Sequence, residues 1–346
     1  MSDFLSISRR SFMKGAAAAT LGATTLATPA LAARAIKLRV SSSAPPERFG
    51  SHYLWFKPFQ DELQRRVGDK IVLEYFPNGQ LGKEADVVNQ VRAGSVDMIM
   101  TGTSIWANLV PEFGLLDLGF LFQSYDHCAK ALDAGVGDAY DKLLQERTGV
   151  SVLGWGFQAG SRSIYTKNKI TSVAELHGVK LRVLPTKAFI DTFNIIGATP
   201  TPIPINECYT AAQTGVVDGM EHDPGTVLAY KWDEVVKYGF LTRHIYTPLL
   251  AYIGKTGLAK IPDEHKKDFM EAAAFATASI RAEAPKVEAE AMDKLKAKNL
   301  EYTEVPKAEL DDLRKRMATE LYPAFLKQYP STEPMFKTIM DMAAAQ

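Results

Sequence analysis

Apolar and polar positions in the first third of the chain follow two different spacings. Residues 36–41, 71–76 and 96–101 carry apolar side chains at alternate positions or in short runs, which is the pattern of half-buried or buried strands. Residues 52–67 and 83–93 instead space their apolar side chains three and four positions apart, which is typical of amphipathic helices. Strands that alternate with helices predict an α/β fold with a mostly parallel sheet.

The same alternation continues in the second half of the chain. Residues 150–166 indicate a long strand or a pair of strands, and the glycines spaced through it mark a bend or a close backbone approach. Further strands are predicted at residues 179–184 and 216–221, with helices at residues 186–196 and 206–214. The repeated β-α-β order and the length of the chain favour two domains.

A long helical segment follows at residues 262–299, with only Pro285 to interrupt it. The mean helix of globular proteins has about 12 residues, so this segment is unusually long. Pro285 predicts a kink or a break, because proline cannot donate the backbone hydrogen bond of a helix interior. Residues 307–345 predict a further pair of amphipathic helices.

The N-terminal segment has the features of an export signal rather than of a folded element. Residues 8–14 read SRRSFMK, which matches a twin-arginine signal, and residues 30–32 offer an A-x-A cleavage site. The apolar stretch between them is too short and too weakly hydrophobic to span a membrane. We expect residues 1–32 to be removed on export to the periplasm, leaving a mature chain from about Ala33; an uncleaved amphipathic tether is the alternative.

Composition narrows the class of partner. The chain has 40 Lys and Arg against 40 Asp and Glu, so neither nucleic acid nor an anionic membrane is expected as a partner. Cys128 and Cys208 are the two cysteines. One disulfide between them is conceivable, but a buried thiol is the simpler expectation for Cys208.

Candidate chemistry lies at strand ends and on one strand interior. Ligands of parallel sheets bind beyond the carboxyl ends of the strands, which points to the loops at residues 43–50 and 101–106. Arg182 lies inside the apolar strand at residues 179–184, where a guanidinium needs a partner because its desolvation is costly. That partner is either a carboxylate of this chain or the carboxylate of a ligand held by the planar fork.

Three separated motifs resemble the extracytoplasmic solute receptors of TRAP transporters, the DctP-type family. The first is FPNGQLG at residues 76–82, followed by VRAGSVD at residues 91–97. The second is GVKLRV at residues 178–183, and the third is ECYTAAQTGVVDGME at residues 207–221. The match covers essentially the whole mature chain in the expected order.

This resemblance implies a two-domain periplasmic-binding-protein architecture, with a mostly parallel sheet in each domain and a long helix that spans both. We expect domain I at residues 33–160 and domain II at residues 161–246. Residues 247–346 would then supply a return strand to domain I, the long helix and the C-terminal helices. Two short crossovers between the domains would form a hinge.

The resemblance also implies a ligand site. In that family the Arg of the G-x-K-x-R strand clamps an organic acid carboxylate, and here it is Arg182. A second cation near the ligand is expected at Arg162, for which a surface Arg at a domain boundary is the alternative. His222 and Asp223 replace the Asn that related receptors commonly carry, which leaves the ligand class open. The remaining expected ligand-binding residues are Glu221, His244, Thr103, Ser104, Trp106 and Trp155.

The function expected from these residues is capture of an organic acid anion for delivery to TRAP membrane subunits. The polar side chains expected at the site favour a sugar acid such as a uronate or aldonate, and Asp223 would disfavour a dianion. The second candidate ligand is a C4-dicarboxylate held at its two ends by Arg162 and Arg182, and the third is an aromatic or keto acid.

Enzymatic chemistry finds less support in the sequence. His222, Asp223 and His244 could form a metal site or a general acid/base pair. However, the chain has no H-E-x-x-H, G-x-S-x-G or P-loop motif, and no G-x-G-x-x-G that follows a strand. We therefore expect no catalytic residue, metal or cofactor.

Overall fold

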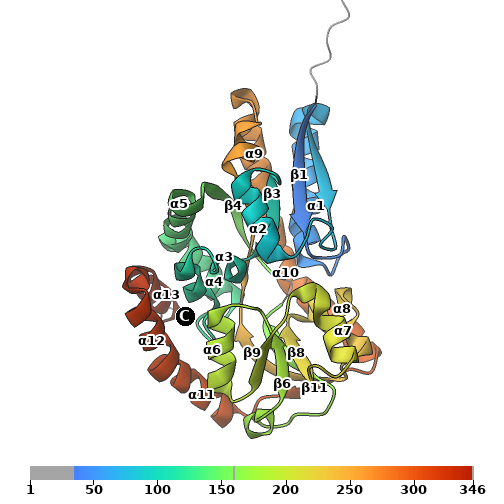
Figure 1. Cartoon of the computed structure of the whole chain (residues 1–346), viewed down its shortest axis with the longest axis vertical. Helices are drawn as coiled ribbons and strands as arrows, with labels where there is room; N and C mark the ends of the chain where they lie inside the picture. The colour runs from blue at the N-terminus through green and yellow to red at the C-terminus, as the bar shows by residue number, and fades with distance from the viewer. Residues whose placement is uncertain (1–34, 159, 345–346) are drawn as a thin grey trace, which may run out of the picture. The chain divides into compact units, whose positions relative to one another are not determined.

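The structure, a computed structural model, describes residues 35–158 and 160–344 and contains two sheets (Figure 1). The predicted leader, with its twin-arginine motif and cleavage site, lies outside the described residues. Among the described residues, no helix is long and apolar enough to cross a membrane.

The first sheet has five strands in the order β2-β1-β3-β10-β4. Its parallel strands carry the apolar runs predicted in the first third of the chain, and β10 runs antiparallel to both of its neighbours. The strands are β1 (Ile36–Ser42), β2 (Ile71–Phe76), β3 (Met98–Gly102), β4 (Val150–Phe157) and β10 (Pro248–Gly254).

The second sheet has six strands in the order β11-β9-β5-β8-β6-β7. Here β5 is the strand that runs against the others, so each sheet is mostly parallel. The strands are β5 (Arg162–Thr166), β6 (Lys180–Val183), β7 (Thr199–Pro202), β8 (Gly219–His222), β9 (Tyr238–Ile245) and β11 (Glu301–Glu304). The predicted segment at residues 150–166 is thus a pair of strands, one in each sheet.

Helices connect the strands, and those at residues 51–67, 84–93, 187–196 and 208–213 lie where the 3.6-residue spacing predicts them. The helices of the first half are α1 (Ser51–Val67), α2 (Glu84–Ala93), α3 (Thr103–Trp106), α4 (Tyr125–Ala131) and α5 (Gly137–Thr148). In the second half they are α6 (Lys187–Ile196), α7 (Cys208–Gln213), α8 (Pro224–Ala229) and α9 (Lys255–Ala259). The helix α6 ends at Gly197, whose φ of 104° suits a residue without a Cβ.

The long helix is α10 (Asp263–Ala297), with 35 residues. It packs against α1 and β4 of the first sheet's half and against α8 of the second. The helix continues through Pro285, so the predicted break does not occur. Three α-helices, rather than the predicted pair, follow β11: α11 (Lys307–Arg316), α12 (Tyr322–Gln328) and α13 (Glu333–Ala344).

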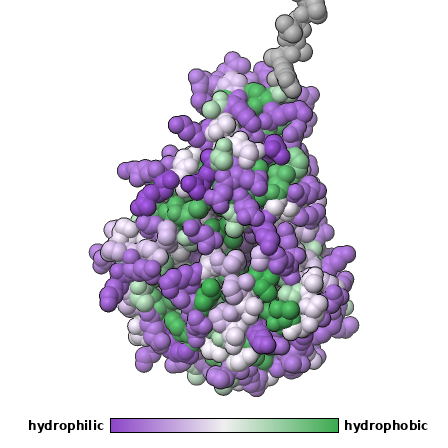
Figure 2. Space-filling model, viewed as in Figure 1, coloured by the Kyte–Doolittle hydropathy of each residue, from purple (hydrophilic) through white to green (hydrophobic). Residues whose placement is uncertain are grey.

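Most large apolar side chains of the described residues are buried between these elements. The exceptions, at least 39% exposed, are Val216, Met270, Phe275 and Met340. Figure 2 accordingly shows one face on which hydrophilic residues predominate. Cys128 and Cys208 are both buried and free, so the possible disulfide does not form.

Candidate functional site

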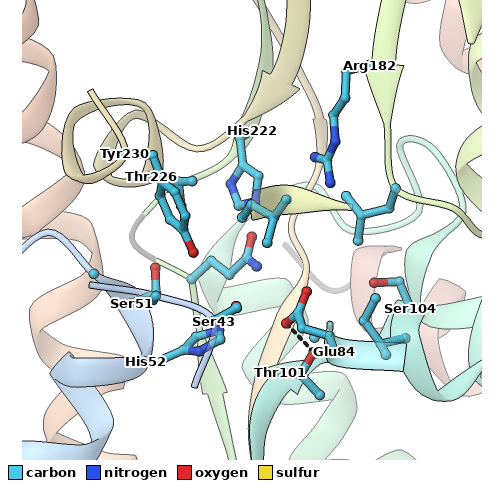
Figure 3. A pocket seen from close by; sticks show the side chains of 17 residues that line it. Ser43, Ser51, His52, Glu84, Thr101, Ser104, Arg182, His222, Thr226 and Tyr230 are labelled. Carbon is cyan, nitrogen blue, oxygen red and sulfur yellow. Dashed lines mark hydrogen bonds between the residues drawn. The ribbon is translucent and has the colours of Figure 1, made fainter. Parts of the chain in front are cut away.

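A polar cavity lies at the carboxyl-terminal ends of strands from both sheets (Figure 3). This is the place that the topology of parallel sheets favours for a ligand. From the side of the first sheet it is lined by Ser43, Ala44, Gly50, Ser51, His52, Glu84, Thr101, Gly102, Ser104 and Ile105. From the connection between the sheets and from the second sheet it is lined by Gln158, Arg182, Leu184, Ile205, His222, Thr226 and Tyr230.

Arg182 points into this cavity from β6 and is only partly satisfied by the protein (Figure 3). Its side chain is 1% exposed, and its Nε donates to the Ile203 carbonyl at 2.8 Å. Its Nη1 is buried without a hydrogen-bond partner and lies 3.9 Å from Glu221 Oε1. A buried donor without a hydrogen bond costs about 1–3 kcal/mol. An acceptor on a ligand would remove this cost at Nη1.

Arg162 lies behind the cavity and not on its wall. Its Nε donates to Glu221 Oε2 at 2.6 Å and its Nη2 to Glu221 Oε1 at 2.7 Å, and both side chains are fully buried. The remaining N–H groups bond to the Glu221 carbonyl, Gln158 Oε1 and His222 Nε2 at 3.1–3.2 Å. Since a guanidinium has five N–H donors, Arg162 is saturated. Arg162 is thus not the surface Arg of the alternative, and its N–H groups are bound within the protein and not directed to the cavity, where a second ligand cation was expected.

Glu221 neutralises this arginine and stays ionised. Burial by itself raises the pKa of the Glu221 carboxyl, but the charge of Arg162 and the hydrogen bond with His244 outweigh it and lower the pKa to about 2. His244 is buried, with Nε2 3.3 Å from Glu221 Oε2 and Nδ1 2.8 Å from Thr242 Oγ1. Neither residue lines the cavity, so both support the site from behind instead of lining it as predicted.

His222 lines the cavity, whereas Asp223 does not. Burial and the charge of Arg162 lower the pKa of His222 to about 4, so its ring is neutral at pH 7. Arg162 can only donate to Nε2, so the ring proton is assigned to Nδ1, which donates to Asp223 Oδ2 at 2.7 Å. His222 therefore has no N–H left for a ligand.

Asp223 caps a helix and does not line the cavity. It is fully buried at the N-cap of α8, where its carboxylate accepts from the Thr226 N–H and hydroxyl, both at 2.9 Å. Because these bonds and His222 occupy the carboxylate, it does not face the cavity as the argument against a dianion requires. The Asp223-Pro224 pair could have predicted this cap from the sequence, since Pro favours the first helical position after a capping Asp.

Of the predicted first-sheet residues, Ser104 lines the cavity, and its buried hydroxyl has no hydrogen-bond partner. Thr103 instead donates to Asp117 Oδ2 at 2.6 Å. Trp106 is 0% exposed and packs on Tyr252. Trp155 is half-buried beside Gly137. These three side chains do not form the opposing wall of this cavity.

That wall contains two titratable residues that the sequence reading missed. Glu84, the first residue of α2, accepts from Thr101 Oγ1 at 2.7 Å, and burial raises the pKa of its carboxyl. His52 is the second residue of α1, and its Nδ1 lies 2.9 Å from Ser42 Oγ. Burial lowers the pKa of His52 to about 3, so its ring is neutral. Both residues follow loops or strand ends, and this position is the sequence feature that could have identified them as site residues.

The histidines and carboxylates of this region do not assemble a metal centre. Among residues 35–158 and 160–344, no group of three or more His, Cys, Asp or Glu is arranged to hold an ion. His222, Asp223 and His244 already bond to Arg162, Thr226 and Glu221. The metal-site alternative therefore lacks free ligands in the described chain.

Comparison with known sequences identifies a family. The family described as "Bacterial extracellular solute-binding protein, family 7" (DctP) matches residues 42–328. A similar curated protein is the 2,3-diketo-L-gulonate-binding periplasmic protein YiaO of Escherichia coli, 32% identical over 73% of this chain and 75% of its own length. A solute-binding protein of Roseobacter denitrificans is 31% identical over 76% of this chain and 80% of its own length.

Solved structures share the fold. The sugar acid binding protein DctPAm of Advenella mimigardefordensis, in complex with galactonate, has a TM-score of 0.83 at 25% identity and covers 89% of this chain and 99% of its own. A TRAP periplasmic solute-binding protein of Polaromonas, bound to D-erythronate, has a TM-score of 0.80 at 27% identity and covers 88% and 97%. A Pseudomonas putida relative with bound D-glucuronate scores 0.79 at 27% identity and covers 88% and 96%.

Proposed function

This chain belongs to family 7 of the bacterial extracellular solute-binding proteins, the DctP family, and from that premise we propose that it is the TRAP-transporter receptor for a sugar acid. Members of this family are solute receptors and not enzymes, and the periplasm is their compartment. In this proposal the twin-arginine leader exports the chain, and TRAP membrane subunits take the ligand from it.

The observation that carries the proposal is the unpartnered Nη1 of Arg182 in a polar cavity. A ligand carboxylate would accept from the guanidinium edge, and such charge-assisted bonds are shorter and stronger than neutral ones. The saturated Arg162–Glu221 pair lies behind it, so one net positive charge faces the ligand from the second sheet.

The other lining groups suit hydroxyls. Ser43, Thr101, Ser104 and Thr226 offer hydroxyl groups, and Gln158 offers an amide. Such groups can both donate and accept, as the hydroxyls of an aldonate or uronate do. Solved relatives of at least 25% identity contain galactonate, D-erythronate, D-glucuronate and L-gulonate, all of which are hydroxylated monocarboxylates.

Capture would proceed by closure of two domains, proposed at residues 33–160 and 161–246, around this cavity. The sheet memberships support this division, because β4 belongs to the first sheet and β5 to the second. The chain returns between β9 and β10, and the strand ends on either side of the two crossings pair with each other, Phe157 with Pro248 and Arg162 with Ile245. In this proposal the two crossings form the hinge. A closed surface that only the occupied receptor presents would signal occupancy to the membrane subunits.

A thermal-shift panel of organic acids tests the proposal, because a ligand that binds only the folded state stabilises it by RT ln(1 + [L]/Kd). The panel contains aldonates, uronates, 2,3-diketogulonate, C4-dicarboxylates and aromatic acids, and hits are followed by calorimetry. We expect the response to be confined to hydroxylated monocarboxylates. A response to C4-dicarboxylates alone would overturn the sugar-acid assignment, and recovery of a chemically altered ligand would overturn the receptor reading.

A C4-dicarboxylate is the weaker candidate on structural grounds. Its two ends would need two available cations, and Arg162 is consumed by Glu221. Among the residues that line the cavity, Arg182 alone carries a permanent positive charge.

A further inference from the structure

The cavity contains one carboxylate, and it comes from the first sheet's side. Five lining side chains can titrate, namely His52, Glu84, Arg182, His222 and Tyr230. Both histidines are neutral at pH 7, because burial lowers the pKa of His52 to about 3 and that of His222 to about 4. Burial also keeps Tyr230 protonated by raising its pKa. The electrostatic character of the cavity therefore rests on Arg182 and Glu84.

We propose that Glu84 determines ligand specificity, binding hydroxyl groups of the ligand and excluding a second carboxylate. This inference rests on the proposed function, because it assumes that a ligand carboxylate pairs with Arg182. It assigns the receptor to polyhydroxylated monocarboxylates and against dicarboxylates of the same length. The predicted role of Asp223 in disfavouring a dianion thereby passes to Glu84.

The Glu84 carboxylate can accept more hydrogen bonds than the protein gives it, because its two oxygens offer about four lone-pair sites. Thr101 Oγ1 donates to Oε1 at 2.7 Å, which fixes the carboxylate at the end of β3. The Ser43 side chain also hydrogen-bonds to this carboxylate. Figure 3 shows the Glu84 carboxylate and the Arg182 guanidinium directed into the same cavity from different sides. Burial raises the pKa of the Glu84 carboxyl, and the bonds from Thr101 and Ser43 and the charge of Arg182 oppose this shift. In its ionised form the carboxylate only accepts hydrogen bonds, so its partner in a ligand must be a donor such as a hydroxyl.

A second ligand carboxylate would meet the opposite situation. It has no proton to donate to Glu84 at neutral pH, and two like charges at close range repel each other strongly when partly removed from water. The adjacent residue Lys83 cannot compensate, because its Nζ pairs with Glu207 Oε1 at 2.6 Å and Lys83 does not line this cavity. No second cation would therefore compensate the cost of desolvating the second carboxylate of the dianion.

A pair of acids that differ in one group isolates this effect. Galactonate ends in a CH₂OH group where galactarate has a second carboxylate, and the rest of the two molecules is the same. We expect wild-type protein to bind the aldonate at least about 30-fold more tightly than the aldarate by calorimetry, about 2 kcal/mol at 1.4 kcal/mol per tenfold. In Glu84→Gln, which keeps the shape and the Thr101 bond, the preference should fall below about fivefold.

Two further variants keep the result interpretable. Glu84→Asp retains the charge but withdraws it, so it should weaken aldonate binding and still reject the aldarate. Asp138→Asn removes an acidic residue from the first turn of α5, where it is exposed and outside the cavity lining, and should change neither affinity.

The outcomes separate this inference from the proposed function. An unchanged aldonate preference in a folded Glu84→Gln variant would overturn the role of Glu84 alone. Loss of aldarate rejection in Glu84→Asp as well would also count against a charge-based mechanism. If the wild type bound neither these two acids nor any acid of the panel, the proposed function would fail and this inference with it.

Discussion

Arg162 and Arg182 are both buried in the second sheet, but they differ in how many N–H groups find partners. Arg162 spends all five of its donors on Glu221, Gln158 and His222. Arg182 donates from Nε to the Ile203 carbonyl, and its buried Nη1 has no hydrogen-bond partner among the described residues. The first arginine is therefore saturated by the protein, whereas the second keeps a buried donor that the proposed ligand carboxylate would satisfy.

Replacement of Arg182 should affect ligand binding more than stability. A hydrogen bond to a charged group contributes about 1.5–3 kcal/mol, so Arg182→Ala should weaken binding of a sugar acid about ten- to a hundredfold by calorimetry. Arg182→Lys should restore only part of this affinity, because an ammonium lacks the bidentate fork. The ligand-free protein should unfold at an unchanged or higher temperature, since a partly satisfied buried cation has been removed.

Equal affinities of wild type and Arg182→Ala would remove Arg182 from the site. An unfolded Arg182→Ala variant would instead show that the weak contact with Glu221, at 3.9 Å, is a structural ion pair.

Glu221 should contribute to the free energy of unfolding, and this contribution should depend on pH. Removing one partner of a buried ion pair typically costs about 3–5 kcal/mol, so Glu221→Gln should lower the free energy of unfolding at pH 7 by that order. Because the folded-state pKa is lowered to about 2, the stabilisation is present above the ordinary carboxyl pKa. It is lost as the pH falls from about 4.5 towards 2. Denaturant titrations of both proteins between pH 7 and 3 measure the difference.

The matched control is Glu304→Gln, which removes the exposed partner of Arg243 and should cost little. A stability difference between wild type and Glu221→Gln that stays constant down to pH 3 would contradict the assigned pKa.

At the residue scale, the sequence predicted those site members that break a local rule. Arg182 was visible because a charge interrupts an apolar strand, and Ser104 because it follows a strand end. Glu84 was hidden, because an acidic residue in the first turn of a helix is ordinary there. Arg162 was misplaced, because nothing local shows that Glu221, 59 positions away, closes a bidentate pair with it.

At the element scale, periodicity predicted the strands β1, β2, β3 and β6 and the helices α1, α2, α6, α7 and α10 within two residues. It did not predict β11 or the short helices α3, α8 and α9. It failed where local preference was overruled by packing. Pro285 does not end α10, whose flanking residues Ala284 and Val287 are buried against neighbouring elements. Sheet order, and the antiparallel insertion of β10, depend on distant pairings that no local pattern encodes.

The glycines of β4 are explained by the helix that crosses them. A Cβ at Gly154 would lie 1.9 Å from Thr277 Oγ1 and 3.1 Å from Thr277 Cβ on α10. Gly154→Ala should therefore force α10 away from β4 and lower the free energy of unfolding by about 1–3 kcal/mol, the usual range for overpacking. Denaturant unfolding measures the loss.

A double-mutant cycle provides the control for this contact. Thr277→Ala alone loses the bond from Trp55 Nε1, but in the Gly154→Ala background it should relieve the clash. The double variant should therefore be more stable than the sum of the single effects predicts. Additive effects would mean that β4 and α10 are not coupled through Gly154.

At the scale of the described chain, contacts between the two sheets' elements flank the cavity. The Arg48 Nε pairs with Glu290 of α10 at 2.8 Å. A second pocket lies next to the cavity and shares Glu84 and Arg182 with its lining. At this second pocket, Lys83 Nζ lies 2.6 Å from Glu207 Oε1. Gly79 lies so close to Asn206 that a Cβ would come within 2.2 Å of Nδ2. Residues 79 and 83 follow β2, whereas residues 206 and 207 precede α7, so these contacts join the two halves.

The Lys83–Glu207 pair should act as a latch of the closed state. Both side chains are about half exposed, at 55% and 51%, and exposed pairs contribute little, so we expect Lys83→Glu or Glu207→Lys to weaken ligand binding only about two- to fivefold. The effect should appear as faster ligand dissociation in stopped-flow measurements, because the latch forms only after closure. The double reversal Lys83→Glu/Glu207→Lys should restore the wild-type rate, and 1 M salt should abolish the differences because it shortens the screening length to about 3 Å. If each reversal changed the dissociation rate independently of the other, the two residues would not be paired in the closed receptor.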